Sequence, residues 1–266
     1  MGREKRAASA MDAPDRDPSH RQSDGMPQKR FYRARAHSNP LNDCQFPVPV
    51  SPVEQDWAEH FPAFFPSDPS VAPLADDAKV RMVDVGCGFG GLLMQLSPLF
   101  PKDLMVGMEL RDKVSEYVKE RILASRKNHP GEFENVSCLR TNAMKYLPNY
   151  FEKGQLTKLF FLFPDPHFKA ANHRRRIVTR TLLAEYAHFL QVGGTLYTVT
   201  DVPELGDWMS EACDNHPLFE RLTQEELDVD PCIPLLTTAT EEGQKVARNE
   251  GVRCMNVFRR ISPEGL

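Results

Sequence analysis

The sequence predicts an α/β fold with a doubly wound, mostly parallel sheet and helices on both of its faces. Apolar segments of strand length alternate with segments of helical periodicity from residue 80 onwards. The first of these strands runs directly into closely spaced glycines, Gly86, Gly88 and Gly91. Alternation of this kind places the strands in parallel and a ligand site at their carboxyl ends.

The first half of the sheet follows from three apolar runs. A strand is expected at residues 80–85, and the glycines after it lead into a short helix at 92–99. A second strand at 104–108 delivers an acid, Glu109, at its carboxyl end. Apolar side chains at helical spacing then predict a helix at 113–126. A further strand is expected at residues 136–140.

The second half begins with the most apolar run of the chain. Residues 159–163 read Leu-Phe-Phe-Leu-Phe, and an uninterrupted apolar run of this kind suits the middle of a parallel sheet. A helix is expected at 181–190, closed by Gly193 and Gly194. The remaining elements are a strand at 195–200, a helix at 204–214 and a last strand at 257–261.

The chain divides into four expected parts. Residues 1–28 are polar and are predicted to be a disordered tail, and residues 29–39 form a basic arm. Residues 40–78 are a Pro-rich linker, packed on the body by its aromatic side chains. Residues 79–266 are the folded domain, because a chain of 266 residues with 41% hydrophobic residues suffices for one sizeable core plus tails.

Composition limits the function classes. A net charge of −4 means that any nucleic-acid surface is a local patch rather than a global bias. The six cysteines are scattered without a C-x-x-C pair, which argues against a metal site or a disulfide framework and favours a reducing compartment. No apolar run approaches membrane-spanning length, and no secretory leader is recognisable, so we expect no membrane association.

The glycine-rich turn predicts an adenosine-containing cofactor. Glycine lets backbone N–H groups approach a ligand, and an acid at the end of the next strand, here Glu109, reaches ribose hydroxyls. Gly86, Gly88 and Gly91 also satisfy the G-x-G-x-x-G pattern of nicotinamide dinucleotide enzymes. Asp84 opposes that alternative by charge repulsion with a pyrophosphate, whereas it suits the cationic S-adenosylmethionine. The pattern resembles motif I of the Rossmann-like class I methyltransferases.

The segment Phe163-Pro164-Asp165-Pro166-His167-Phe168-Lys169 follows the central strand and should lie beside the cofactor. Two prolines fix the backbone around Asp165 and hold its carboxylate in one direction. The alternative is a structural Pro-rich turn in which Asp165 accepts backbone hydrogen bonds like a helix N-cap.

Four segments resemble the tRNA (guanine-N7)-methyltransferases of the eukaryotic type: residues 30–40, 84–91, 159–169 and 240–243. The resemblance covers residues 28 to about 261, except for the Pro-rich linker. It implies methylation of guanosine 46 in the variable loop of tRNA, with Asp165 as the catalytic acid. It further implies that S-adenosylmethionine is held by Gly86, Gly88, Glu109, Arg111, Asn142, Ala143, Leu162, Thr240 and Glu242.

The resemblance also implies a partner. The eukaryotic enzymes work with a non-catalytic WD-repeat β-propeller subunit. The basic arm indicates a nuclear location, with the cytoplasm as a second compartment. A non-catalytic RNA-binding subunit with the same fold is the alternative, and the intact glycines and Asp165 argue against it.

Basic residues gather in the arm and just after Asp165, where they predict an RNA-binding rim. The alternative is a solvated basic turn, and Ala170 and Ala171 stand where the family commonly carries further basic residues. Ser38 follows Arg33 and Arg35 in an R-x-R-x-x-S pattern, which basophilic kinases recognise. Phosphorylation of Ser38 is expected to lower activity. The alternative is that the pattern occurs by chance and the serine is not modified. The expected RNA-binding residues are Lys29, Arg30, Arg33, Arg35, Lys169, Arg174, Arg175 and Arg176.

Overall fold

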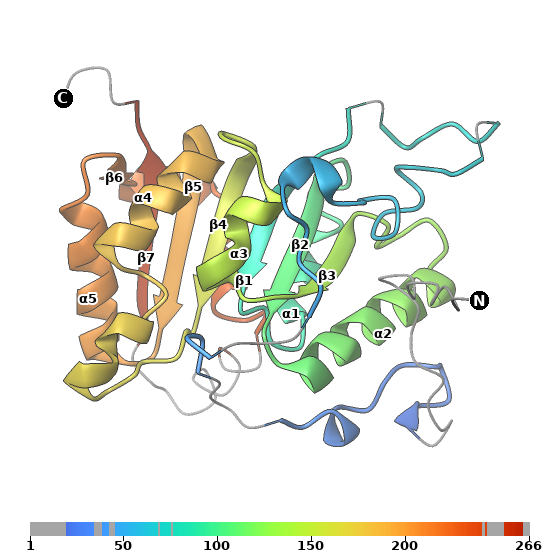
Figure 1. The fold of residues 1–266 in the computed structure, drawn as a ribbon, viewed down its shortest axis with the longest axis horizontal. Coiled ribbons are helices and arrows are strands. Elements are labelled where there is room, and N and C mark those ends of the chain that lie inside the picture. Colours follow the sequence, from blue (N-terminus) through green and yellow to red (C-terminus); the bar gives the residue numbers. More distant parts are fainter. Residues whose placement is uncertain are drawn as a thin grey trace, which may run out of the picture.

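The computed structural model describes residues 20–34, 39–42, 46–68, 70–75, 77–240, 243 and 253–262. These residues form a sheet with the strand order β3-β2-β1-β4-β5-β7-β6 (Figure 1). Strands β1 to β5 pair in parallel and β7 is antiparallel to both of its neighbours, which confirms the predicted mostly parallel sheet. The strands are β1 (Val80–Val85), β2 (Leu104–Glu109), β3 (Val136–Arg140), β4 (Leu156–Leu162), β5 (Leu190–Thr200), β6 (Phe219–Arg221) and β7 (Cys254–Arg260).

Helices cover both faces of the sheet, as expected for a doubly wound fold. The face seen in Figure 1 carries α3 (Ala143–Tyr150) and α4 (Arg180–Phe189), and α5 (Pro203–Asp214) belongs to the same apolar cluster. The opposite cluster contains side chains of α1 (Gly91–Leu96), α2 (Asp112–Asn128) and α7 (Ile233–Leu236). The short helix α6 (Gln224–Val229) precedes α7, and none of the described helices has the length and hydropathy needed to cross a membrane.

The second half of strand β4, residues 159–162, is apolar at every position. Leu159 and Phe161 enter the core cluster on one face, whereas Phe160 and Leu162 enter the cluster on the other. Successive side chains of a strand point to opposite faces, so a strand that is buried on both sides must be apolar at every position. The carboxyl end of this strand is therefore fixed in the middle of the sheet, where Asp165 follows.

Several elements differ from the sequence prediction, and β6, α6 and α7 were not predicted at all. Helix α4 ends at Phe189 and β5 begins at the next residue, so Gly193 and Gly194 lie inside a strand and do not close a helix. A Cβ at Gly194 would lie 3.0 Å from the Gln191 carbonyl oxygen and 3.1 Å from that of Thr157, so this glycine serves close backbone approach. Helix α3 was not predicted, because Pro148 interrupts its pattern.

Residues 20–28 correct the expected tail boundary. Arg21 forms an isolated bridge with Pro27, and its guanidinium lies 3.5 Å from the buried carboxylate of Glu120 in α2. Asn128, at the end of the same helix, donates to the Asp24 carbonyl oxygen at 2.9 Å. Contacts to α2 therefore order this stretch, and the basic arm starts from a fixed point on the body.

Aromatic side chains hold the linker against the sheet. Phe61 and Phe64 are buried in the core cluster that contains α3 and α4, and Trp57 and Phe65 pack against it. The ring of Trp57 stacks on that of Phe151, with centroids 6.1 Å apart. The linker thus forms part of one wall of the body despite its high proline content.

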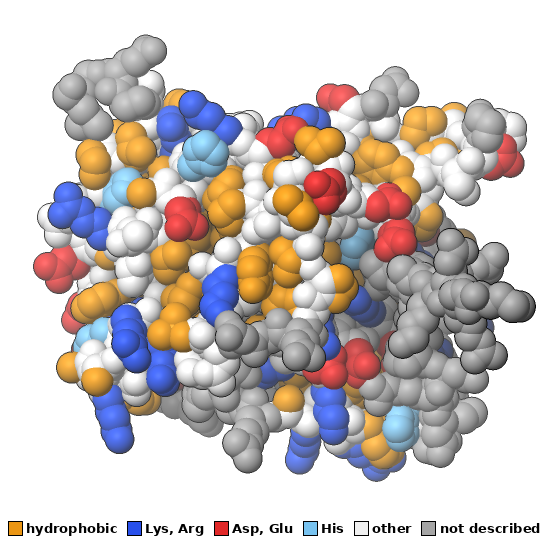
Figure 2. Space-filling model, in the orientation of Figure 1, with side chains coloured by type: hydrophobic (Ala, Val, Ile, Leu, Met, Phe, Trp, Pro, Cys, Tyr) orange, Lys and Arg blue, Asp and Glu red, His pale blue; other side chains and the backbone are white. Residues whose placement is uncertain are grey.

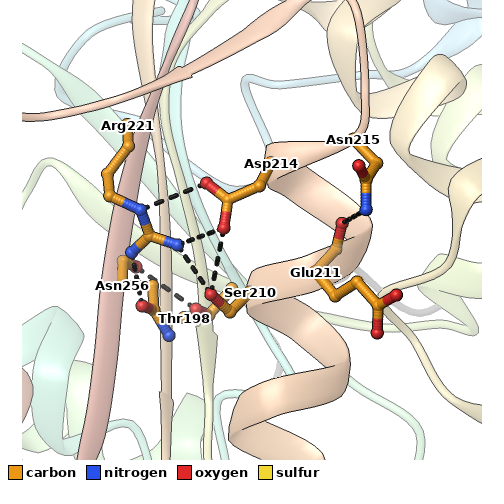
Figure 3. A network of polar contacts seen from close by, with 7 residues as sticks. All are labelled: Thr198, Ser210, Glu211, Asp214, Asn215, Arg221 and Asn256. Atoms are coloured by element: carbon orange, nitrogen blue, oxygen red, sulfur yellow. Dashed lines mark hydrogen bonds and ion pairs between the residues drawn. The ribbon is translucent and has the colours of Figure 1, made fainter.

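A polar network fixes the far edge of the sheet (Figure 3). Arg221 of β6 donates from Nε and Nη2 to the two carboxylate oxygens of Asp214 in α5, at 3.1 and 2.6 Å. It also donates to Ser210 in α5 and to the Asn256 side chain in β7, both at 2.6 Å. One guanidinium therefore joins β6, β7 and the carboxyl-terminal half of α5.

Candidate active site

Two adjoining cavities lie at the carboxyl ends of β1, β2, β3 and β4. Their volumes are about 180 Å³ and about 540 Å³. Such a pair of connected spaces suits an elongated ligand whose two ends differ in chemistry. The wall that they share consists of Gly86, Arg111, Leu162, Phe163, Pro164 and Asp165.

The glycine-rich turn forms the floor of the larger cavity. Gly86 and Gly88 have φ angles of 73° and 54°, a left-handed conformation that other residues adopt only with strain. A Cβ at Gly91 would lie 2.0 Å from the Ala239 carbonyl oxygen, so only glycine admits the segment that carries Thr240. The Thr240 hydroxyl accepts from the Gly243 N–H at 3.0 Å, and Thr240 itself lines the larger cavity.

Glu109 lies at the end of β2 and links the turn to Arg111. Its Oε2 accepts from the Gly88 N–H at 3.1 Å and from Arg111 Nη2 at 2.9 Å. Its Oε1 accepts from Arg111 N and Nε at 2.9 and 3.0 Å. The hydrogen bond to Glu109 is the main cause that raises the pKa of Arg111, and the charge of Asp165 adds to it. These four bonds occupy the carboxylate, so a further donor would have to displace one of them.

Asn142 and Ala143 form the far end of the smaller cavity. Asn142 is the N-cap of α3, where its Oδ1 accepts from the Met144 N–H at 3.1 Å. Its Nδ2 donates to the Pro40 carbonyl oxygen at 2.6 Å, which brings the linker to the cavity rim. Leu162 supplies an apolar wall between the two cavities.

Asp84 is a buried acid at the wall of the larger cavity. Its side chain is almost fully buried, and Oδ2 has no hydrogen-bond partner among the described residues. Burial, with a smaller contribution from the charge of Glu109, raises the pKa of Asp84 to about 7. A buried carboxylate of this kind is stabilised by a cationic ligand and destabilised by an anionic one.

This environment predicts a pH dependence of cofactor binding. Because the pKa of Asp84 lies well above its ordinary value of 3.8, the unliganded protein holds it largely protonated at pH 5.5 and half ionised near pH 7. Affinity for S-adenosylmethionine should therefore rise about tenfold from pH 5.5 to 7. This range lies below the ordinary α-amino pKa of about 7.7–8.0, so the ligand's ammonium stays charged. Calorimetry on the wild type and Asp84→Asn measures the effect, and equal pH profiles would contradict it.

Asp165 stands in a constrained loop between the two cavities. Phe163 and His167, two residues before and after it, have φ angles of 51° and 46°. Non-glycine residues are held in this conformation only when the surroundings enforce it, typically at functional sites. The Phe163 N–H donates to the Val199 carbonyl oxygen at 2.7 Å, which ties the start of the loop to β5.

The expected RNA-binding residues fall into different environments. Lys169 and Arg174 are exposed, whereas Arg175 lines the smaller cavity. Figure 2 shows Lys and Arg side chains gathered along the lower edge of the view, where the parallel strands of Figure 1 end. Arg176 is wrongly predicted as a phosphate contact, because its side chain is only 1% exposed and ion-paired with Glu204.

The basic arm reaches the site at its first residue. Lys29 lines the larger cavity, and its Nζ lies 5.5 Å from the centre of the Phe89 ring in the glycine-rich turn. Arg30 and Arg33 are exposed. Three expected site residues lie outside the described residues, namely Arg35, Ser38 and Glu242.

The structure adds cavity residues that the sequence analysis did not assign. Arg121 lies on the buried side of α2, lines the larger cavity and donates to the Phe89 carbonyl oxygen at 2.9 Å. A basic residue within the apolar stripe of a helix was the available signal. Asp201, after β5, and Phe168 also line this cavity. Asp201 gave a weaker signal as an acid at the carboxyl end of a strand.

Comparisons with known proteins agree with this geometry. A family model described as "Putative methyltransferase" matches residues 78–255. The "tRNA (guanine-N(7)-)-methyltransferase" of Oryza sativa subsp. japonica is 61% identical over 239 residues, 89% of this chain and 92% of its own. This chain belongs to the tRNA (guanine-N7)-methyltransferase family.

Other members of the family are similar over the same extent. The Arabidopsis thaliana protein is 61% identical over 90% of this chain and 94% of its own, and the Xenopus laevis protein 55% over 89% and 90%. Among solved structures, the 16S rRNA methyltransferase KamB matches at a TM-score of 0.47 with 18% identity, over 73% of this chain and 96% of its own. The family assignment rests on the sequence relatives.

Proposed function

We propose that this chain transfers a methyl group from S-adenosylmethionine to N7 of guanosine 46 in the variable loop of tRNA. The observation that carries the proposal is the position of Asp165, which lines both cavities at the carboxyl edge of the sheet. The smaller cavity has the chemistry for the cofactor's nucleoside, and the larger one is lined by the glycine-rich turn and by the exposed Lys29. Membership in the tRNA (guanine-N7)-methyltransferase family supports the choice of substrate.

The two cavities together fit S-adenosylmethionine better than a nicotinamide dinucleotide. Asp84 offers a buried carboxylate oxygen without a partner among the described residues, which suits an ammonium or sulfonium group and repels a pyrophosphate. Glu109 and Arg111 would hold the ribose, Asn142 and Ala143 the adenine, and Gly86 and its neighbours the methionyl part. Binding of S-adenosylhomocysteine with no binding of NADH in the same calorimeter would support this assignment.

The transfer needs orientation more than proton movement. Bound S-adenosylmethionine supplies an electrophilic methyl group, which forms a bond to N7 as the bond to sulfur breaks and its electron pair returns to sulfur. Guanine N7 carries an in-plane lone pair, so no base is needed to remove a proton. Holding the two reactants in line can supply up to about 7–11 kcal/mol of the barrier reduction. The rigid loop around Asp165 is suited to that task.

Asp165 stabilises the charge that arrives on the base. Positive charge moves to the guanine ring during the transfer, and a fixed carboxylate beside the ring favours that redistribution. A carboxylate also accepts from the N–H groups of guanine, which adenine does not present in the same pattern. The constrained backbone at Phe163 and His167 supports a role in orientation.

The exposed basic residues are expected to bind tRNA phosphates. Replacing Lys169 and Arg174 together with Ala should weaken tRNA binding and make its salt dependence shallower by about two phosphate contacts. Affinity for S-adenosylmethionine should stay unchanged. Lys79 and Lys153 give a matched control, because they are exposed and precede β1 and β4 at the opposite edge of the sheet. If the dependence of tRNA affinity on salt concentration were unchanged in the Lys169/Arg174 variant, these residues would be ordinary solvated side chains and would not contact phosphates.

We further propose a WD-repeat β-propeller partner and a nuclear location for the complex. The support is the family resemblance and the basic arm.

The target nucleoside and the effect of the partner are tested in one experiment. It compares wild-type tRNA with a transcript carrying adenosine at position 46, each with and without the propeller subunit. We expect methylation only of the wild-type transcript and a higher rate with the subunit. Equal methylation of both transcripts would reject guanosine 46 as the target.

A further inference from the structure

Arg176 is a buried cation that joins three parts of the chain. Its Nη2 donates to both carboxylate oxygens of Glu204 at 2.9 and 2.8 Å, and its Nε donates to the Pro166 carbonyl oxygen at 3.0 Å. The guanidinium carbon lies 4.7 Å from the centre of the Trp208 ring. The residue thus connects the end of the basic turn (Ala170–Arg175), the loop that carries Asp165, and helix α5.

Stability alone is a poor explanation for this arrangement. Removing a guanidinium from water is costly unless all its donors are satisfied, and Nη1 of Arg176 has no hydrogen-bond partner among the described residues. An apolar side chain at this position would avoid that cost. The planar guanidinium, however, can bond a carboxylate and a carbonyl oxygen at the same time in fixed directions. This property points to a role in geometry.

The bond to Pro166 acts one residue from Asp165. The start of the loop is tied to β5 through Phe163 and Val199, as described above. The bond from Arg176 to the Pro166 carbonyl fixes the other side, just before the left-handed residue His167. Asp165 therefore sits between two backbone anchors, one from the sheet and one from Arg176.

The second anchor rests on a rigid support. Glu204 lies in the first turn of α5, where a negative charge also suits the helix dipole. Trp208, one turn further along α5, donates to the Val178 carbonyl oxygen at 2.8 Å. The other end of α5 is held by the Arg221 network of Figure 3. Helix α5 is thus held by hydrogen bonds near both ends, and Arg176 connects it to the loop that carries Asp165.

We infer that Arg176 and Glu204 are positioning residues that hold Asp165 in its productive orientation. The inference rests on the role proposed above for Asp165. Arg176 also stands directly after the basic turn. Neither residue lines the described cavities, so both act through the loop and make no contact with the cofactor.

The test uses Arg176→Lys, which keeps the charge and loses the forked geometry, and Glu204→Gln. We expect single-turnover methylation of tRNA to fall about 10- to 100-fold in Arg176→Lys, and less in Glu204→Gln. Affinity for S-adenosylhomocysteine and the KM for tRNA should stay within about twofold of wild type. Glu211→Gln is the matched control, because Glu211 lies on the same helix and is not among the hydrogen-bond partners of Arg176; it should keep the wild-type rate.

Four outcomes separate the possibilities. A merely structural role would lower the thermal stability and the fraction of sites that bind S-adenosylhomocysteine, with a normal rate per competent site, and this would overturn the inference. A wild-type rate in folded Arg176→Lys would also overturn it. Combining Arg176→Lys with Asp165→Ala should add no further loss to Asp165→Ala alone, whereas additive losses would contradict action through Asp165. Full activity of Asp165→Ala would instead reject the proposed role of Asp165.

Discussion

Asp165→Ala is expected to lower the rate of N7-methylation about 10²- to 10³-fold, which is the scale for removing one fixed electrostatic group from a transition state. Affinity for S-adenosylmethionine should change little, because the pocket walls contributed by Glu109, Asn142 and Leu162 remain. Single-turnover methylation of tRNA at saturating cofactor, combined with calorimetry, measures the two quantities separately.

Asp165→Asn refines the same prediction. Asparagine keeps the shape and one acceptor oxygen but loses the charge, so its rate should lie between those of wild type and Asp165→Ala. A wild-type rate in the folded alanine variant would reject the catalytic assignment. Equal losses in both variants would identify the charge, and not the acceptor geometry, as the useful property.

Glu109→Ala is expected to weaken S-adenosylmethionine by about 1.5–3 kcal/mol, the contribution of hydrogen bonds to a charged acceptor. This corresponds to roughly a 10- to 100-fold loss of affinity. The Gly88 N–H and the Arg111 guanidinium also lose their acceptor, so both the turn and the side chain become less ordered. Calorimetric titration with S-adenosylhomocysteine checks the prediction.

The control for this variant is Glu152→Ala. Glu152 is an exposed acid whose carboxylate pairs with Lys79 at the opposite edge of the sheet. Its replacement should leave cofactor affinity unchanged. If Glu109→Ala bound as tightly as this control, Glu109 would not belong to the cofactor site.

The sequence predicted the central part of the fold well, because its signals are local. Residues 159–162 of β4 are buried on both faces of the sheet and are therefore apolar at every position, and the strand was recognisable for that reason. The left-handed glycines of the turn and the acids Asp84 and Glu109 lie at strand ends, where position along the chain already determines position in space.

The less successful predictions concern contacts between distant segments. Residues 174–176 are three consecutive arginines, and the sequence does not distinguish them. Only Arg176 is buried, because it packs against Glu204 and Trp208. The approach of Ala239 to Gly91 likewise depends on tertiary packing that no local pattern encodes. Helix α3 forms despite Pro148, because Leu147 and Tyr150 are buried against the sheet.

One product decides whether this chain methylates guanine N7 in tRNA with S-adenosylmethionine as the donor. Nucleoside mass spectrometry tests this directly, with a transcript, the propeller subunit and a cofactor whose methyl group carries an isotopic label. We expect labelled N7-methylguanosine with the wild-type chain and a strongly reduced amount with Asp165→Ala. Label on another atom or nucleoside, or no label with folded protein that binds S-adenosylhomocysteine, would contradict this expectation.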